Sequence, residues 1–133
     1  MSLAVVDASV LAAFYAADDP RRDVVAAKLA AGNALYAPAH LDVEVASALR
    51  GMARANSPLL AAVPAALRHL AALPVRRMPL AGLLGRIWEL RDNLTPYDAA
   101  YVALAERLRC ALLTCDAKLA AVPGTECGVD LIG

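Results

Sequence analysis

The chain has 133 residues, of which 60% are hydrophobic and 20% are charged. This composition excludes an intrinsically disordered chain, and the length predicts a single domain over residues 1–133 with a full hydrophobic core. The 13 basic and 13 acidic residues cancel, which argues against a protein that coats nucleic acid through a basic surface but leaves room for a nuclease with a local basic rim.

The sequence predicts a cytoplasmic protein. Glycine or proline interrupts each uncharged stretch well before the roughly 18 to 20 residues that a membrane span requires, and the amino terminus meets an acid at Asp7 without a basic leader, so we expect no signal peptide. Three cysteines are expected to be reduced thiols packed as small hydrophobic side chains. Neither His40 nor His69 has finger-like spacing to them, which argues against a zinc site.

Short apolar runs alternate with longer segments of helical period, and the run at residues 3–6 has the character of a strand buried on both faces. In chain order the predicted elements are a strand at 3–6, helices at about 9–16 and 21–31, a strand at 34–36, helices at about 40–55 and from 57 onward, a weak strand at 75–78, helices at about 80–91 and 95–108, a strand at 111–114, a short helix at 116–121 and an edge strand at 129–132.

The helix that starts at Ser57 carries two prolines. Ser57 is expected to cap it with Pro58 in its first position, and Pro64 is expected to kink or restart it. The alternation as a whole predicts an α/β fold, a three-layer α/β/α sandwich around a short, mostly parallel sheet. Ligands of such sheets bind beyond the carboxyl ends of the strands, so the residues that follow each strand are the first candidates for a site.

Four acids stand at strand ends or helix starts. Asp7 ends the first strand, Asp116 follows the strand at 111–114, Asp98 lies in the first turn of a helix and Glu44 near the start of another. Each also has a structural explanation, because Asp7 and Asp116 can cap helices and Asp98 stands three residues after Thr95 in a capping-box arrangement.

Helical periodicity puts Asp98 on the apolar side of its helix, with no basic residue three or four positions later to pair with it. Glu44 flanks an apolar stripe of its own and is likewise expected to lack a local basic partner, because Ser47 and Ala48 stand one turn along. Asp42 flanks the other side of that stripe, so periodicity does not choose between the two acids. Converging carboxylates repel one another unless a divalent cation lies among them. Mg²⁺ and Mn²⁺ prefer such oxygen ligands, and we expect no histidine or cysteine to compete as a donor there.

Four segments in this order, AVVDASVLAAFY, LDVEVASALR, LTPYDAAYVALAERL and ALLTCDAKL, resemble the PIN-domain family. More narrowly they resemble the VapC-type toxins of bacterial toxin–antitoxin pairs. The resemblance covers the chain from Leu3 to about Leu119 and implies a cytoplasmic, metal-dependent endoribonuclease that is inhibited by a small antitoxin protein.

Carried over residue by residue, the resemblance implies that the family's four acids are Asp7, Glu44, Asp98 and Asp116, which selects Glu44 over Asp42. Asp7, Asp98 and Asp116 would bind Mg²⁺ or Mn²⁺, and Glu44 would orient or deprotonate the attacking water. The supporting hydroxyl residues are Ser9 and Thr114.

Two other functions stay open. One is a PIN-like module that binds a partner without catalysis, its acids serving only as helix caps. The other is a receiver-type signalling domain. Such a domain needs a second acid beside the first, and this chain has Ala8 at that position, which argues against it. The excess of apolar side chains on helices such as 59–73 predicts a homodimer and a groove for an antitoxin helix.

Overall fold

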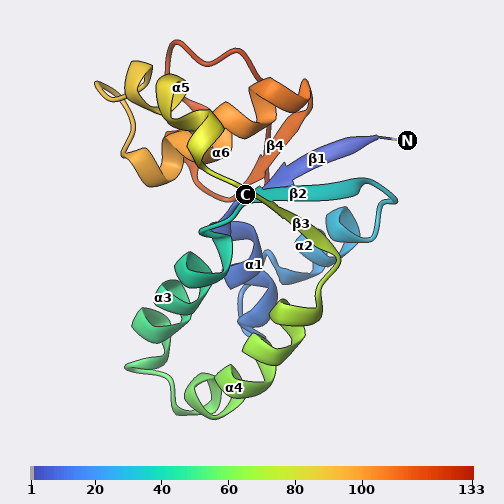
Figure 1. Ribbon diagram of the computed structural model, residues 1–133. Helices are drawn as coiled ribbons and strands as arrows, with labels where there is room; N and C mark the ends of the chain where they lie inside the picture. The colour runs from blue at the N-terminus through green and yellow to red at the C-terminus, as the bar shows by residue number, and fades with distance from the viewer. Residues whose placement is uncertain (1) are drawn as a thin grey trace.

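The fold is built on a five-stranded parallel sheet in the order β3-β2-β1-β4-β5, seen in a computed structural model that describes residues 2–133 (Figure 1). The strands are β1 (Leu3–Val6), β2 (Ala34–Pro38), β3 (Val75–Met78), β4 (Ala111–Thr114) and β5 (Val129–Leu131). The helices are α1 (Ala8–Tyr15), α2 (Arg22–Leu29), α3 (Leu41–Ala53), α4 (Ser57–Ala72), α5 (Leu84–Glu89), α6 (Pro96–Leu108) and α7 (Ala117–Ala120), with a 3₁₀ turn η1 (Ala81–Leu83) before α5.

The central strand β1 positions the rest of the sheet. Val5 pairs with Tyr36 on β2 and with Leu112 on β4, and Val5 itself is completely buried. Because β1 and β4 are parallel neighbours, the residues that follow them emerge at the same edge of the sheet. The expected α/β/α fold is confirmed, and the sheet is entirely parallel.

Helices cover both faces of the sheet. In Figure 1, α1, α3 and α4 lie below the sheet and α5 and α6 above it. α6 packs on β1, β2 and β4, and all seven residues from 99 to 105 are buried. The expectation of one apolar stripe on this helix was therefore too narrow, because α6 is enclosed by the sheet on one side and by η1 and α5 on another.

The predicted elements are confirmed in type and order, with two corrections at α4. Asn56, and not Ser57, is the N-cap, and its side chain accepts a hydrogen bond from the backbone N–H of Leu59 at 3.1 Å. The helix also does not restart at Pro64. This proline lies on an exposed side of the helix together with Leu60, where water can replace the hydrogen bond that proline cannot donate to the Leu60 carbonyl.

Three further features concern sequence expectations. The segment expected as one helix over 80–91 is a 3₁₀ turn followed by the six-residue α5. Across residues 2–133, no helix is both long enough and apolar enough to cross a membrane. Cys110, Cys115 and Cys127 are free and half-buried.

Candidate functional site

Asp7 stands at the carboxyl end of the central strand, where β1 turns into α1. Its carboxylate caps α1 by accepting a hydrogen bond from the backbone N–H of Val10 at 3.2 Å, and the residue is only 5% exposed. Burial raises the pKa of Asp7 above its ordinary value despite the hydrogen bonds to the carboxylate, and the negative charge of Asp98 raises it further.

Two hydroxyl groups hold the Asp7 carboxylate. Ser9 donates to Oδ1 at 2.6 Å, and Thr114, at the end of β4, donates to Oδ2. Both hydroxyls also accept backbone hydrogen bonds from the loop after β4, Ser9 from Cys115 at 2.9 Å and Thr114 from Asp116 at 3.0 Å. This network ties the loop that carries Asp116 to the loop that carries Asp7.

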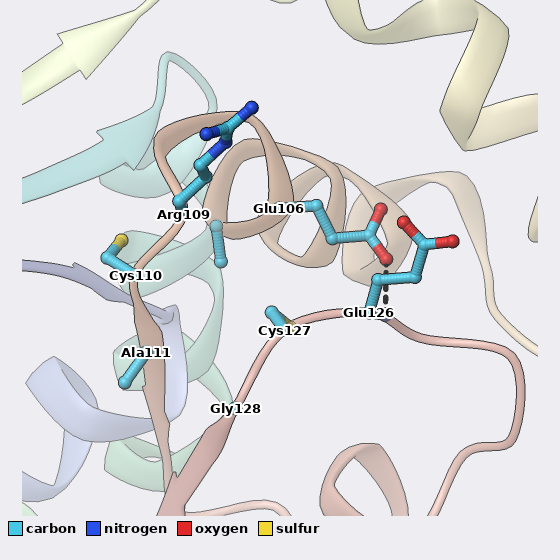
Figure 2. Close-up of a pocket in the computed structure, with 8 residues that line it drawn as sticks. Glu106, Arg109, Cys110, Ala111, Glu126, Cys127 and Gly128 are labelled. Carbon is cyan, nitrogen blue, oxygen red and sulfur yellow. Dashed lines mark hydrogen bonds between the residues drawn. The ribbon is translucent and has the colours of Figure 1, made fainter.

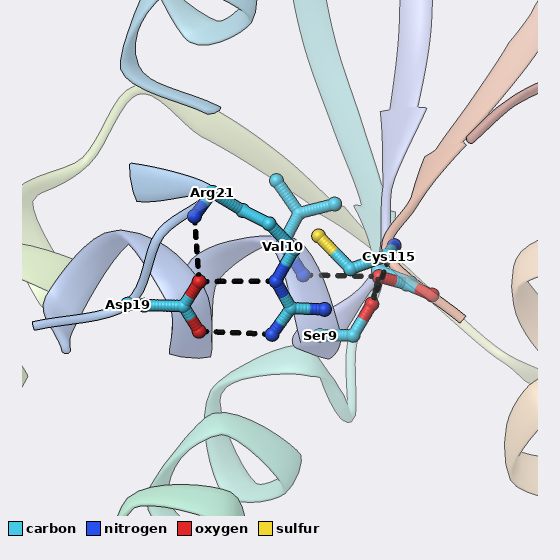
Figure 3. Close-up of polar contacts among 6 residues, drawn as sticks. Ser9, Val10, Asp19, Arg21 and Cys115 are labelled. Atoms are coloured by element: carbon cyan, nitrogen blue, oxygen red, sulfur yellow. Dashed lines mark hydrogen bonds and ion pairs between the residues drawn. The ribbon is translucent and has the colours of Figure 1, made fainter. Parts of the chain in front are cut away.

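A neutralised ion pair lies next to this network. Asp19 holds the guanidinium of Arg21 through two hydrogen bonds of 3.0 and 2.8 Å. Figure 3 shows this pair beside Ser9 and Cys115. Because Arg21 is already paired with Asp19, it does not neutralise Asp7 directly.

Asp116 follows β4 at the same sheet edge as Asp7. Its side chain accepts the backbone N–H of Lys118 at 2.9 Å and so caps α7. The capping explanation that the sequence allowed for Asp7 and Asp116 is therefore correct for both residues. Capping leaves a carboxylate charge in place, so it does not exclude a second role.

Asp98 lies in the first turn of α6, where Thr95 is the N-cap and accepts the backbone N–H of Asp98 at 3.2 Å. Burial raises the pKa of Asp98, and the charges of Glu44 and Asp116 raise it further. Four acids from four separate segments of the chain thus interact electrostatically at this edge, since the Asp7 carboxyl also responds to the charge of Asp98.

Glu44 and Asp42 lie two residues apart on α3 and have different partners. Asp42 pairs with Arg77 of β3 at 2.9 Å, whereas Glu44 accepts a hydrogen bond from Tyr101 of α6 at 2.6 Å. Glu44 therefore lies with the acid group and Asp42 does not. Burial raises the pKa of Glu44, but the hydrogen bonds from His40 and Tyr101 outweigh it and hold the pKa below its usual value.

His40 is the residue that the sequence reasoning missed. Its Nε2 atom lies 3.1 Å from Oε1 of Glu44 and 3.0 Å from the carbonyl oxygen of Tyr97, and its pKa is raised by the hydrogen bond with Glu44. The expectation that Glu44 has no local basic partner, and that no histidine lies near the acids, was wrong. The available signal was the spacing of four residues, which puts His40 and Glu44 on one helical face.

The donor set fits a hard divalent cation in its chemistry. Carboxylate oxygens are the ligands that such ions prefer. The pKa values of Asp7 and Asp98 are raised first by burial and then by the charges of neighbouring acids, and a bound cation would favour the ionised form of both. Among residues 2–133, however, no three acidic, histidine or cysteine side chains stand close enough to form a ready-made cation site. The hydrogen bonds to Asp7 and Glu44 already engage one or both oxygens of each carboxylate.

Two cavities lie at opposite ends of the strands. One, of about 530 Å³, is next to the acids and is lined by Ser9, Glu44 and the exposed Tyr97 together with side chains of α1 and α3. The other, of about 460 Å³, lies at the amino ends of β4 and β5 (Figure 2) and contains Glu106, Glu126 and two of the cysteines. Only the first is continuous with the acid group.

Comparison with known proteins identifies the relatives of the chain. Residues 4–124 match the family model of the PIN domain. A VapC ribonuclease of Mycobacterium bovis is 41% identical over 128 residues, which cover 96% of this chain and 97% of that protein. Ribonuclease VapC3 of Mycobacterium tuberculosis is 47% identical over 116 residues, which cover 87% of this chain and 84% of that protein.

A solved structure has the same fold. The crystal structure of VapC20 of Mycobacterium tuberculosis, described as a toxin that cleaves the sarcin–ricin loop, matches with a TM-score of 0.68 and 20% sequence identity, covering 92% of this chain and 96% of that chain. At this identity the likeness supports the architecture alone.

Proposed function

The chain belongs to the PIN-domain family and is a ribonuclease of the VapC toxin type, and from this premise we propose that it cleaves RNA at the carboxyl edge of its sheet with Asp7, Glu44, Asp98 and Asp116. The observation that carries the proposal is the raised pKa of Asp7 and of Asp98, caused first by burial and then by the charge of neighbouring acids. A protein that needed these acids only as helix caps gains nothing from bringing them within range of one another's charge.

The proposed cofactor is Mg²⁺ or Mn²⁺, held by Asp7 and Asp98 with Asp116 as a further ligand. When bound, such an ion lowers the pKa of a water molecule and offsets negative charge on the phosphate. The fit rests on the oxygen donors and on the uncompensated charge, which a divalent ion relieves.

The remaining residues prepare the site. Ser9 and Thr114 orient the Asp7 carboxylate by donating to its two oxygens. Glu44, whose pKa lies below its usual value, is ionised at neutral pH, and both of its hydrogen-bond partners contact Oε1. Its other oxygen, Oε2, is proposed to orient the attacking water.

The proposed partners are an RNA substrate, a small antitoxin protein and a second copy of the chain. Exposed apolar side chains support a protein interface, among them Leu60, Leu84 and Trp88, with Leu84 and Trp88 one turn apart on α5. Because the substrate is RNA, the proposed place of action is the cytoplasm. A molar mass measured by light scattering, with and without the antitoxin, tests both protein partners.

The test of the activity is a map of 5′-phosphate RNA ends in cells that express the wild type, Asp98→Asn or Asp92→Asn. Hydrolysis by an activated water leaves a 5′-phosphate, so the wild type is expected to produce a discrete set of such ends and Asp98→Asn to lose it. Asp92 is an exposed aspartate just before α6, and its variant should keep the wild-type ends. Equal cleavage by wild type and Asp98→Asn means that Asp98 is only structural, whereas the absence of these ends with all three chains is the result expected of a binding module without catalysis.

A further inference from the structure

The cavity beside the acid group has walls of two kinds. Ser9 and Glu44 take part in the hydrogen bonds of the acid group, whereas Val43 and Tyr97 are exposed side chains, and all four line the cavity. Its volume of about 530 Å³ falls within the roughly 300 to 1,000 Å³ typical of small-molecule sites. No basic side chain lines it, so the cavity suits a flat, uncharged group better than a phosphate.

Tyr97 is the aromatic wall of this cavity. It immediately precedes Asp98, and its backbone carbonyl oxygen lies 3.0 Å from Nε2 of His40. The side chain is 63% exposed and its ring lies 6.2 Å from the His40 ring, centroid to centroid. The backbone is thus held at the acid group while the ring stays available for contact.

We propose that this cavity is a subsite for one unstacked base of single-stranded RNA, with Tyr97 stacking on the base next to the cleaved phosphate. The inference rests on the proposed function, because it takes the acid group as the point of cleavage. Base stacking on an aromatic ring is the common way in which proteins hold single-stranded RNA, and it tolerates different sequences because every base has a π face.

Position favours an RNA base over a peptide side chain in this cavity. Glu44 and Ser9 belong both to the cavity and to the acid network, so an RNA strand whose phosphate reaches the acids passes the cavity opening. A base in the cavity also fixes the register of the strand, which orients the phosphate for attack. Tyr97 is therefore a positioning residue for the reaction.

The experiment measures binding of end-labelled single-stranded RNA decamers, all-uridine and all-adenosine, by fluorescence anisotropy with EDTA present to prevent cleavage. Tyr97→Ala is expected to weaken binding of at least one decamer by about 5- to 150-fold, the range for loss of one base–aromatic stack. Tyr97→Phe keeps the ring and should stay within about twofold of wild type. Val24→Ala is the control for loss of an exposed apolar side chain elsewhere, because Val24 is 52% exposed and does not line the cavity.

Binding of a ribose phosphate decamer without bases shows whether Tyr97→Ala loses a contact with a base or with the RNA backbone. If Tyr97 stacks on a base, Tyr97→Ala and wild type bind this backbone equally. Equal loss on the backbone, or no loss on either decamer, overturns the inference. A variant that binds RNA normally but loses the antitoxin protein also overturns it, and assigns the cavity to that protein.

Failure of the subsite and failure of the proposed function are distinguishable. Mn²⁺-dependent cleavage of total RNA by wild type and Asp98→Asn tests the acids, whereas the binding measurement needs no metal. Cleavage lost in Asp98→Asn together with unaltered binding by Tyr97→Ala refutes the subsite alone.

Discussion

The molecule has two groups of acids, and the surroundings of Glu106 in one and of Asp7 in the other shift the carboxyl pKa in opposite directions. At the amino ends of β4 and β5, Glu106 on α6 receives two hydrogen bonds from Arg86 at 2.7 and 3.0 Å. The backbone N–H of Glu126 donates a third to Glu106 at 2.6 Å (Figure 2). Burial raises the pKa of Glu106, but these donors outweigh it and the pKa lies below its ordinary value. At the carboxyl edge, hydroxyl groups contact Asp7 and its pKa is raised.

The difference separates structural acids from candidate functional ones. A carboxylate that only supports the fold is stabilised by a cation within the chain, as Glu106 is by Arg86 and Asp42 by Arg77. Asp7 and Asp98 have no such partner in contact, and burial raises the pKa of both, so their ionised forms cost stability. This cost is expected where the missing positive charge comes from a bound ion or a substrate.

The largest expected effect is on catalysis. Asp7→Asn should lower the rate of RNA cleavage by at least about 100-fold, because the amide is a poorer ligand for the ion and lacks the charge. Glu106→Gln, an equally conservative change of a partly buried acid, should leave the rate within about threefold. Both rates are measured on the same RNA at saturating Mn²⁺, with folding checked by circular dichroism. Comparable losses in the two variants would erase the distinction between the two groups.

Metal binding sharpens the comparison through stability. Mg²⁺ or Mn²⁺ at about 100 times its dissociation constant should stabilise the wild type by ~2.7 kcal/mol, read as a rise in Tm by calorimetry. Asp98→Asn should lose most of this rise, while Glu106→Gln should keep it. EDTA should remove both the rise and RNA cleavage. A rise of the same size in Asp98→Asn would place the ion elsewhere.

Glu106→Gln is expected to destabilise the protein by roughly 1 to 3 kcal/mol, since it weakens charged hydrogen bonds to Arg86 and to the backbone of Glu126. Urea unfolding of wild type and variant measures the loss. Asp92→Asn is the control for removal of one negative charge at an exposed site, and its stability should stay within about 0.5 kcal/mol of wild type. An unaltered midpoint for Glu106→Gln would contradict its structural role.

The smallest expected effect has the opposite sign. Asp7→Asn should stabilise the metal-free protein at pH 7 by on the order of 1 kcal/mol, because it removes a buried charge while the hydroxyls of Ser9 and Thr114 can still bond the amide. The folded pKa of Asp7 lies above its reference value of 3.8, so ionisation opposes folding. The gain should therefore vanish below about pH 3.8, grow as the pH rises from there to the folded pKa, and level off above it. Urea midpoints across this pH range provide the measurement, and a variant less stable than wild type at pH 7 would contradict the sign.

The sequence was sufficient for much of the fold and for the position of Asp7 and Asp116 at one edge of the sheet. Runs such as residues 3–6 are apolar throughout, which is the pattern of a strand buried on both faces, and parallel strands bring their following residues to one edge. The Thr95–Asp98 spacing likewise predicted the start of α6, because side-chain capping is a local interaction.

Other assignments needed contacts between distant segments. Asp42 and Glu44 flank one stripe of α3, and only the packing of β3 and α6 shows that Asp42 pairs with Arg77 while Glu44 contacts Tyr101. The continuity of α4 through Pro64 depends equally on which side of the helix faces solvent. The pairing of His40 with Glu44 was readable from spacing, but the contact of His40 with the backbone carbonyl of Tyr97 was not.

The order of apolar runs and turn residues was enough to specify a parallel α/β/α sandwich with acids at its carboxyl edge, because periodicity and capping act over a few residues. Which acids share an electrostatic environment, which are neutralised by arginine and where a cavity opens beside them followed from packing, because Coulomb interactions and burial depend on separation in space and not along the chain.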